Sequence, residues 1–495
     1  ADGGDEIVLA GHVDAPGEAR VLDDGVAFGD LRYTRVRAWD AAGVELAAAI
    51  EWNAAARTLA LRVDASGAEF PVTIDPLLST ASWTADPTNQ EAALFGNSVA
   101  GAGDVNGDGF SDVLVGAPYW DGPAADEGRA YLYLGSSSGL ALLPAWTADP
   151  TDQAYANFGT SVATASDVNG DGFSDVVLGA PYWDGAVTDE GRAYLYLGSS
   201  SGLATTPAWT ADPTDQAVAV FGFSVASAGD VNGDGFADVI AGAHLWDGAA
   251  PDEGRAYVYL GSASGLATAA AWTADPTDQS WAYFAVSVAS AGDVNGDGFG
   301  DVIVGAHYWN GAATDEGRAD VYLGSAAGLA SAPAWTADPT DQAYAYFGVS
   351  VAGAGDVNGD GFADVIVGAR DWDGVAADEG RAWLYLGSPS GLALLPAWTA
   401  DPTDQASANF GYSVASAGDV NGDGFADVIV GAHEWDGAAE NEGRAYLYLG
   451  SASGLALAPA WTADPTDQPG AEFGVSVAGA GDVNGDGFAD VIVGA

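Results

Sequence analysis

Residues Asp482 to Ala495 read DVNGDGFADVIVGA, and this stretch is one copy of a sequence that recurs along the chain. The other copies follow one another at intervals of 63 residues and begin at Asp104, Asp167, Asp230, Asp293, Asp356 and Asp419. A fixed period of this length is typical of repeat proteins, in which each unit buries its hydrophobic surface against its neighbours. Most of the 495-residue chain is therefore built from one repeated unit.

Each complete unit contains four short runs that predict strands: FGxSVA, DVIVGA, RAYLYLG and AWTAD. They are rich in Val, Ile, Tyr and Trp and are bounded by Gly, Asp, Pro or Ser. Four short strands in each unit are typical of one blade of a β-propeller. We therefore predict an all-β fold with a seven-bladed propeller over residues 79–495, whose last blade is incomplete. Residues 1–78 lie outside the repeat, and their short alternating runs, such as Thr58–Ala65, predict a small β-sandwich-like domain.

The loop that opens each copy predicts a calcium site. In DVNGDGFSD, residues Asp104–Asp112, oxygen-bearing side chains stand at positions 1, 3, 5 and 9, and Phe110 at position 7 can offer its backbone carbonyl. Hard oxygen donors at alternate positions of a tight loop suit Ca²⁺, and Gly109 allows the sharp turn, as in an EF-hand loop. Position 12 is Val115 rather than Glu, and a strand follows instead of a helix. A plain turn is the alternative interpretation, but without a cation three carboxylates would repel one another in every copy.

We expect about one Ca²⁺ in each loop, seven in all, with ligands at positions 1, 3, 5, 7 and 9. The expected ligands are Asp104, Asn106, Asp108, Phe110, Asp112, Asp167, Asn169, Asp171, Phe173, Asp175, Asp230, Asn232, Asp234, Phe236, Asp238, Asp293, Asn295, Asp297, Phe299, Asp301, Asp356, Asn358, Asp360, Phe362, Asp364, Asp419, Asn421, Asp423, Phe425, Asp427, Asp482, Asn484, Asp486, Phe488 and Asp490.

The run FGNSVAGAGDVNGDGFSDVLVGA, from Phe95 to Ala117, resembles the FG-GAP repeat of integrin α-subunit propellers and of many bacterial extracellular proteins. The resemblance covers about residues 82–495 and implies a seven-bladed propeller with Ca²⁺ in loops on one face. Ala285 replaces the glycine of FG in one unit. The proline that follows Gly-Ala in the first two units is replaced by His244, His307, Arg370 and His433. Because proline and arginine share this position with histidine, we expect a solvated loop there rather than a pH-sensitive ring or a metal site.

Charge and composition limit the possible partners. Seventy acidic residues stand against thirteen arginines and no lysine, which gives a formal net charge of −57. Nucleic acids and anionic membranes need clustered Lys or Arg, and no apolar run is long enough to cross a bilayer, so we expect neither nucleic-acid binding nor membrane insertion. Such a chain attracts divalent cations, although its acidity also suits a salt-adapted organism. The chain has no cysteine, so disulfide bonds cannot stabilise its fold, and bound metal ions are another means of doing so.

Two further features recur in every complete unit. We expect the arginine of DEGR, Arg129 in the first unit, to pair with Asp126 or Glu127 and to lie on an aromatic ring rather than to bind an anion. We expect the tryptophan of AWTADP, such as Trp146, to pack between blades. The tryptophan of the WDG turn, such as Trp120, is as consistent with sugar binding as with packing.

These observations favour a non-enzymatic, calcium-binding protein that is extracellular or on the cell surface and serves adhesion or surface structure. A carbohydrate-binding propeller that uses the repeat tryptophans is the alternative. We expect protein or glycan ligands on the cell surface or matrix as partners, and self-assembly through the incomplete last blade. No unlike catalytic groups stand apart from the repeat, which argues against an enzyme. Because the seventh unit lacks the RAYLYLG run, we also expect a fragment of a longer repeat protein, with Ala81–Pro87 as the outermost strand of that blade.

Overall fold

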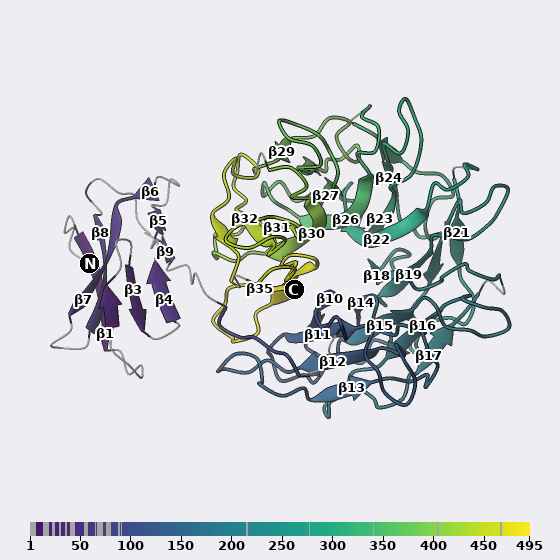
Figure 1. Ribbon diagram of the computed structural model, residues 1–495, viewed down its shortest axis with the longest axis horizontal. Helices are drawn as coiled ribbons and strands as arrows, with labels where there is room; N and C mark the ends of the chain where they lie inside the picture. Colours follow the sequence, from purple (N-terminus) through teal and green to yellow (C-terminus); the bar gives the residue numbers. More distant parts are fainter. Residues whose placement is uncertain are drawn as a thin grey trace. The chain divides into compact units, whose positions relative to one another are not determined.

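A computed structural model describes residues 81–495 except 88–89, 91, 214–215, 277, 340, 403–404 and 466–467. Within residues 1–80 it describes Ala47, Ser66 and the strands given below. The described residues form strands and turns without a helix. The chain divides into two compact units, Ala1–Thr84 with Trp461–Pro465 and Ala85–Ala460 with Thr466–Ala495 (Figure 1).

Within Ala1–Thr84 the structure describes nine strands in three sheets, ordered β1-β8-β7, β2-β3-β4 and β6-β5-β9. The strands are β1 (Glu6–His12), β2 (Ala19–Val21), β3 (Gly25–Phe28), β4 (Leu31–Thr34), β5 (Arg37–Trp39), β6 (Glu45–Leu46), β7 (Ala48–Asn53), β8 (Thr58–Asp64) and β9 (Thr73–Asp75). A sandwich arrangement of these sheets stays a prediction.

Six four-stranded sheets follow, each with its strands in chain order, and a two-stranded sheet completes the series. The first three are β10 (Ser98–Gly103), β11 (Asp112–Ala117), β12 (Arg129–Tyr133) and β13 (Trp146–Ala148); β14 (Val162–Ser166), β15 (Asp175–Ala180), β16 (Arg192–Tyr196) and β17 (Trp209–Ala211); and β18 (Ser224–Gly229), β19 (Asp238–Ala243), β20 (Arg255–Tyr259) and β21 (Trp272–Ala274). The next three are β22 (Phe284–Gly292), β23 (Asp301–Ala306), β24 (Arg318–Tyr322) and β25 (Trp335–Ala337); β26 (Phe347–Gly355), β27 (Asp364–Ala369), β28 (Arg381–Tyr385) and β29 (Trp398–Ala400); and β30 (Phe410–Gly418), β31 (Asp427–Ala432), β32 (Arg444–Tyr448) and β33 (Trp461–Ala463). The seventh sheet pairs β34 (Val477–Gly481) with β35 (Asp490–Val493).

This order is a β-propeller with six complete blades and a partial seventh, and the four predicted runs of each complete blade form its four strands. Figure 1 shows the blades following one another around a central axis, so that β35 comes to lie near β10. Backbone hydrogen bonds join the seventh unit to the first blade, since Ser111 N donates to Asp482 O at 2.9 Å and Ser136 N to Val483 O at 3.0 Å. The described residues Ala81–Pro87 form no strand, so the prediction that they supply the outermost strand of the seventh blade is wrong.

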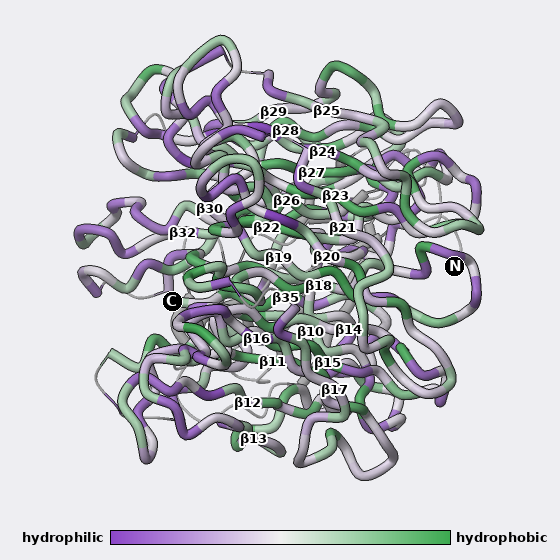
Figure 2. Tube along the Cα trace, turned by 90° about the vertical axis from the view of Figure 1, so that its right-hand side faces the viewer, coloured by the Kyte–Doolittle hydropathy of each residue, from purple (hydrophilic) through white to green (hydrophobic). Residues whose placement is uncertain are grey.

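The hydrophobic core lies between neighbouring blades. The second strand of each complete blade is buried along its whole length, as β11 is from Asp112 to Ala117, because it is covered by a blade on either side. One core cluster joins Leu114 and Trp146 of the first blade to Leu178 and Tyr196 of the second. Figure 2 shows hydrophobic residues along the strands and many hydrophilic ones in the loops that connect them. None of the described segments forms a helix that could span a membrane.

Candidate functional site

The DVNGDG loops join the first and second strands of each blade. In the first loop the Asp104 carboxylate accepts hydrogen bonds from the loop's own amides: Oδ1 from Gly107 N (2.6 Å) and Asp108 N (3.1 Å), and Oδ2 from Gly109 N (2.8 Å). Gly107 and Gly109 have φ values of 74° and 92°, a backbone conformation that residues with a side chain rarely adopt. The other six loops repeat the bonds from both glycines.

The side chains at positions 3 and 5 close the same turn. Asn106 Oδ1 accepts from Asp108 N at 2.8 Å, and Asp108 Oδ1 accepts from Phe110 N at 3.1 Å. Asn106 Nδ2 donates to Asp108 Oδ2 at 2.9 Å, so the two side chains also touch each other. The loop therefore presents oxygen atoms of Asp104, Asn106 and Asp108 on a short segment that is half-buried to exposed.

Position 9 has a structural role that sequence reasoning missed. Asp112 is fully buried, and its Oδ2 accepts from Val105 N at 3.0 Å while its Oδ1 accepts from Gly135 N at 2.9 Å. Burial raises the pKa of Asp112 to about 6, although the two amides lower it, and the nearby Asp108 and Asp104 raise it further. Gly135 directly follows the RAYLYL run, so this carboxylate ties the loop to the third strand of its own blade. A glycine at that point in every complete unit was the available signal.

The donor set of these loops fits Ca²⁺ by its chemistry. Carboxylate, amide and carbonyl oxygens are hard donors, and each carboxylate oxygen that accepts an amide proton keeps a further lone pair. In this structure the loop oxygens bond to the loop's own amides, and among the described residues no three side chains of Asp, Glu or His lie close enough together to hold one metal ion. The sequence-predicted ligands at positions 1, 3 and 5 thus lie together on one turn, while the carboxylate at position 9 is turned to backbone amides.

With the loops and blades described, the repeat can be compared with known families. The model described as "FG-GAP repeat" matches residues 95–133, 158–196, 221–259, 284–322, 347–385, 410–448 and 473–495, just over half of the chain. The chain belongs to the FG-GAP repeat family.

Curated relatives of this FG-GAP protein include integrin α subunits. Integrin alpha-IIb of Mus musculus is 38% identical over 160 residues, which cover 31% of this chain and 15% of the relative. Integrin alpha-4 of Xenopus laevis is 36% identical over 161 residues, which cover 32% of this chain and 15% of the relative. Integrin alpha-V of Gallus gallus is 34% identical over 168 residues, again with 15% of the relative covered. The chain thus spans about one seventh of the length of these proteins.

Neighbouring FG-GAP loops touch one another around the ring. The aromatic ring of Phe173 in the second loop lies against Gly107 of the first, so closely that a Cβ on Gly107 would stand 2.6 Å from it. The backbone agrees, since Ser174 N donates to Asp104 O at 3.0 Å. The same contact joins the seventh loop to the first, where Phe110 lies against Gly485. All seven loops are therefore connected in a closed series.

The DEGR arginines occupy one face of the WDG tryptophans. The guanidinium carbon of Arg129 lies 3.4 Å from the Trp120 ring centre, and four other units place it at 3.4 or 3.5 Å. The predicted ion-pair partners are wrong: Arg129 pairs with Asp149, at the end of the fourth-strand run, whereas Glu127 is buried and accepts from Ala124 N at 3.1 Å. The guanidinium leaves less of each indole ring for stacking on a sugar.

The AWTADP tryptophans pack between blades, as the sequence predicts. Trp146 Nε1 donates to Ala204 O of the next unit at 2.9 Å, and its ring meets the edge of Tyr196 at 4.9 Å between centroids. The same hydrogen bond recurs from Trp209, Trp272, Trp335 and Trp398.

The prediction of a solvated loop at the three histidines is wrong. His244, His307 and His433 are 8%, 7% and 7% exposed, and their Nδ1 atoms have no hydrogen-bond partner among the described residues. Aromatic rings cover two of them: the rings of Phe223 and His244 meet edge to face with their centroids 4.2 Å apart, and the ring of Tyr412 lies tilted against His433 at 3.9 Å between centroids. Burial lowers the pKa of His244 to about 3 and of His433 to about 4, and it lowers the pKa of His307 as well.

Proposed function

We propose that this FG-GAP protein is a non-enzymatic, extracellular calcium-binding protein of adhesion or surface structure, in which Ca²⁺ staples the blades. The observation that carries the proposal is the sevenfold recurrence of one oxygen-lined turn with the same internal hydrogen bonds. Similarity to integrin α subunits supports the adhesion class and a position at the cell surface. Protein ligands are the partners that this class favours.

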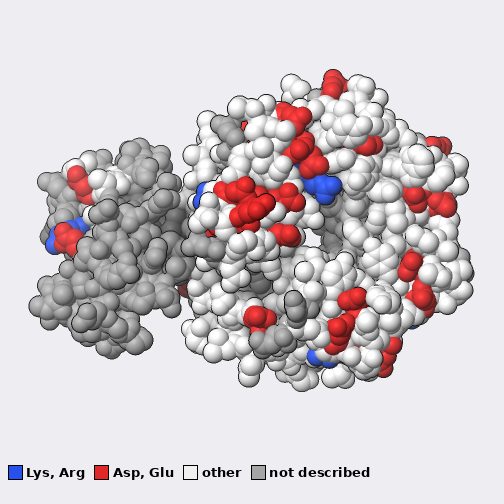
Figure 3. Space-filling model, in the orientation of Figure 1, with Lys and Arg blue, Asp and Glu red and all other residues white. Residues whose placement is uncertain are grey.

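Positions 1, 3, 5 and 9 of each loop, with the carbonyl at position 7, would hold the ion, as Asp104, Asn106, Asp108, Phe110 and Asp112 would in the first. The cation would supply positive charge beside the carboxylates of positions 1, 5 and 9. In the space-filling view, acidic side chains are spread over the visible face of the propeller and basic ones are few (Figure 3). An ion in each loop therefore offsets part of the net charge of −57.

A loop-bound ion would stabilise more than its own loop. Each loop contacts the next through the Phe173–Gly107 type of packing, and position 9 bonds to the amide that follows the third strand. Fixing one loop therefore fixes the connection between strands one and three and part of a blade interface. Because a ligand that binds only the folded state stabilises it by mass action, extracellular calcium would control the rigidity of the scaffold.

The metal proposal is tested by calorimetry on the whole chain. Titration with CaCl₂ is expected to give about seven binding events, and thermal unfolding in CaCl₂ is expected at a clearly higher Tm than in EGTA, since [Ca²⁺] at ~100 times Kd adds ~2.7 kcal/mol per site. Asp297→Asn should remove one site. Asp152→Asn removes the same charge outside the loops and should leave the count unchanged. An absence of binding heat together with equal melting in EGTA would contradict the metal proposal.

Adhesion is tested separately. Cells seeded on surfaces coated with the chain are expected to attach in calcium and to detach in EGTA, whereas a coat of heat-denatured chain should hold none. Attachment that is absent in calcium would remove the adhesion proposal and leave the metal proposal standing. Binding to a glycan array, lost on Trp120→Ala, would favour the carbohydrate-binding alternative.

A further inference from the structure

The turn between the second and third strands of the fourth blade differs from its counterparts. Five units have an aspartate before the glycine of this turn, whereas the fourth has Asn310 followed by Gly311. Asparagine before glycine is chemically labile, because the glycine nitrogen can attack the asparagine side chain and glycine has no Cβ to hinder the approach. The chain contains eight such pairs, and the other seven lie at positions 3 and 4 of the DVNGDG loops. By sequence alone the eight pairs are equivalent.

The seven loop pairs hold the attacking nitrogen in a hydrogen bond. In the first loop Gly107 N donates to Asp104 Oδ1 at 2.6 Å, and the matching distances in the other six loops are 2.6 or 2.7 Å. A hydrogen bond to a carboxylate is strong, and the attack requires it to break. The side chain of Asn106 is also held, since its Oδ1 accepts from Asp108 N and its Nδ2 donates to Asp108 Oδ2. The loops therefore protect their Asn-Gly pairs.

The turn of the fourth blade leaves its glycine nitrogen without such a bond. Gly122 N, the counterpart in the first blade, donates to Ala124 O at 3.2 Å, and the other turns that contain aspartate repeat this bond at 3.2 or 3.3 Å. Gly311 is exposed, and no acceptor for its N–H lies among the described residues. The nitrogen is therefore open to water, which must take its proton before it can attack.

The side chain of Asn310 is held in a way that favours the attack. Its Oδ1 accepts from Asp315 N at 2.8 Å. Negative charge develops on this oxygen when Gly311 N adds to Cγ, and a hydrogen-bond donor that is already in place stabilises such charge. Nδ2, the atom that leaves, makes longer bonds, to Gln279 Oε1 at 3.2 Å and to Tyr308 O at 3.4 Å. The carbonyl group is thus activated, and the leaving nitrogen is weakly held.

We propose that Asn310 and Gly311 form a self-modification site, where the chain converts the asparagine to aspartate and isoaspartate without an enzyme. Water takes the proton of Gly311 N, and this nitrogen forms a bond to Asn310 Cγ. The bond from Cγ to Nδ2 breaks, and Nδ2 takes up a proton from water and leaves as ammonia. One water molecule then hydrolyses the cyclic imide: cleavage at Cγ gives aspartate, and cleavage at the backbone carbonyl carbon gives isoaspartate. Nothing is oxidised or reduced, and neither calcium nor adhesion takes part.

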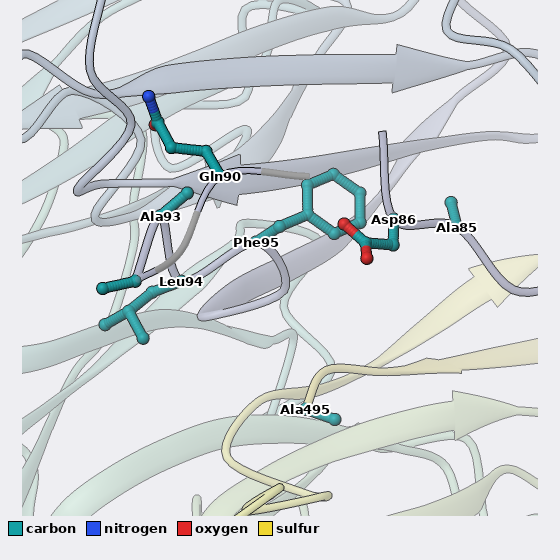
Figure 4. Close-up of a pocket in the computed structure, with 8 residues that line it drawn as sticks. Ala85, Asp86, Gln90, Ala93, Leu94, Phe95 and Ala495 are labelled. Carbon is teal, nitrogen blue, oxygen red and sulfur yellow. The ribbon is translucent and has the colours of Figure 1, made fainter. Parts of the chain in front are cut away.

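The aspartate product fits the turn, because five units already contain it. In the first unit Asp121 Oδ1 accepts from Asp126 N at 2.8 Å, which matches the bond that Asn310 accepts. Gln90 Nε2 donates to Asp121 O at 3.1 Å, and Figure 4 shows this glutamine side chain directed away from Ala495. An equivalent bond, at 2.9 Å, holds the turn of the fourth blade. Isoaspartate adds a carbon atom to the backbone here, so we expect it to loosen the turn that aspartate preserves.

The test incubates the whole folded chain in CaCl₂ at pH 7.5 and maps its peptides by mass spectrometry at intervals. Exchange of NH₂ for OH at residue 310 is expected at least ~10-fold faster than at any loop asparagine, because each loop nitrogen must first lose a charge-assisted hydrogen bond. Electron-transfer fragmentation should find both aspartate and isoaspartate at this position. In guanidinium chloride, where the fold is lost, all eight asparagines should react at similar rates.

Asp293→Ala tests the protection of the loops. It removes the acceptor of Gly296 N, so Asn295 should begin to react while Asn358 in the next loop stays protected. The ranking within the parent chain needs no variant, so the test holds even where Asp293→Ala does not fold. A loop asparagine that reacts as fast as Asn310 in the folded parent would overturn the proposal. So would aspartate without isoaspartate, because the side chain would then be hydrolysed directly, without attack by the backbone nitrogen.

Discussion

Replacing His244 with phenylalanine should make the propeller more resistant to acid. His244 is 8% exposed, and burial alone lowers its pKa from 6.5 to about 3. As the pH falls below 6.5, the unfolded chain takes up this proton while the folded chain does not. The contribution of the neutral histidine to stability is therefore complete above pH 6.5 and is lost progressively toward pH 3. Each pH unit in this interval lowers the free energy of unfolding by ~1.4 kcal/mol, so at pH 5 the loss is ~2 kcal/mol.

Phenylalanine keeps a ring in contact with Phe223 and removes the unpartnered Nδ1, so His244→Phe should not lose stability at pH 7.5. Urea unfolding of parent and variant at pH 7.5, 6.5, 5.5 and 5.0, in saturating CaCl₂, measures the difference directly. The two curves should coincide at pH 7.5 and separate by ~2 kcal/mol at pH 5. His433→Phe should behave alike down to its own pKa of about 4 and gain little below it. Equal pH slopes in parent and His244→Phe would refute the burial argument.

Two further predictions concern backbone positions, both measured by urea unfolding. Gly298→Ala should lower the free energy of unfolding by ~1–2 kcal/mol through its φ of 88° alone, since a Cβ there meets nothing within 4 Å. Gly296→Ala should lower it by ~1–3 kcal/mol more, because its Cβ would stand 2.6 Å from the Phe362 ring. Equal losses would contradict the loop-to-loop contact. Among the described residues, the buried Oε1 of Glu127 has no hydrogen-bond donor, whereas in the second unit Ala186 N donates to the matching Glu190 Oε1. Pro123→Ala should supply this amide and stabilise the fold by ~1 kcal/mol, because the new hydrogen bond outweighs the entropy advantage of proline. A loss of stability would show that Glu127 needs no such donor.

The strands and loops of the propeller were predictable because their signals are local. A run such as DVLVGA, bounded by a DVNGDG turn and a proline, forms β11 almost to the residue. The turn itself follows from glycines at fixed offsets, which the chain supplies at 107 and 109. Each of these elements depends on residues within about ten positions of one another, and sequence patterns report well on that scale.

The partners of individual polar groups were not predictable in the same way. Asp112 bonds to Gly135, 23 residues on, and Arg129 pairs with Asp149 rather than with the acids beside it. These partners depend on the register in which neighbouring strands pair, and a local sequence pattern does not predict that register. The burial of His244 depends on rings from two adjacent units, so the exchange of histidine with proline and arginine at that position gave a misleading indication of exposure.

The seventh loop should be the weakest of the proposed calcium sites, because one of the two amides that hold its position-9 carboxylate in the other loops has no counterpart among the described residues. In six loops this carboxylate is held by two amides, one from the loop and one from the residue after the third strand, whereas among the described residues Asp490 accepts only from Val483 N. A ligand with fewer constraints loses more conformational freedom on binding an ion. In calcium titrations Asp486→Asn should therefore remove the lowest-affinity site, and Asp297→Asn should remove one of the tighter ones. Seven equivalent sites would show that the second amide at position 9 does not affect calcium affinity.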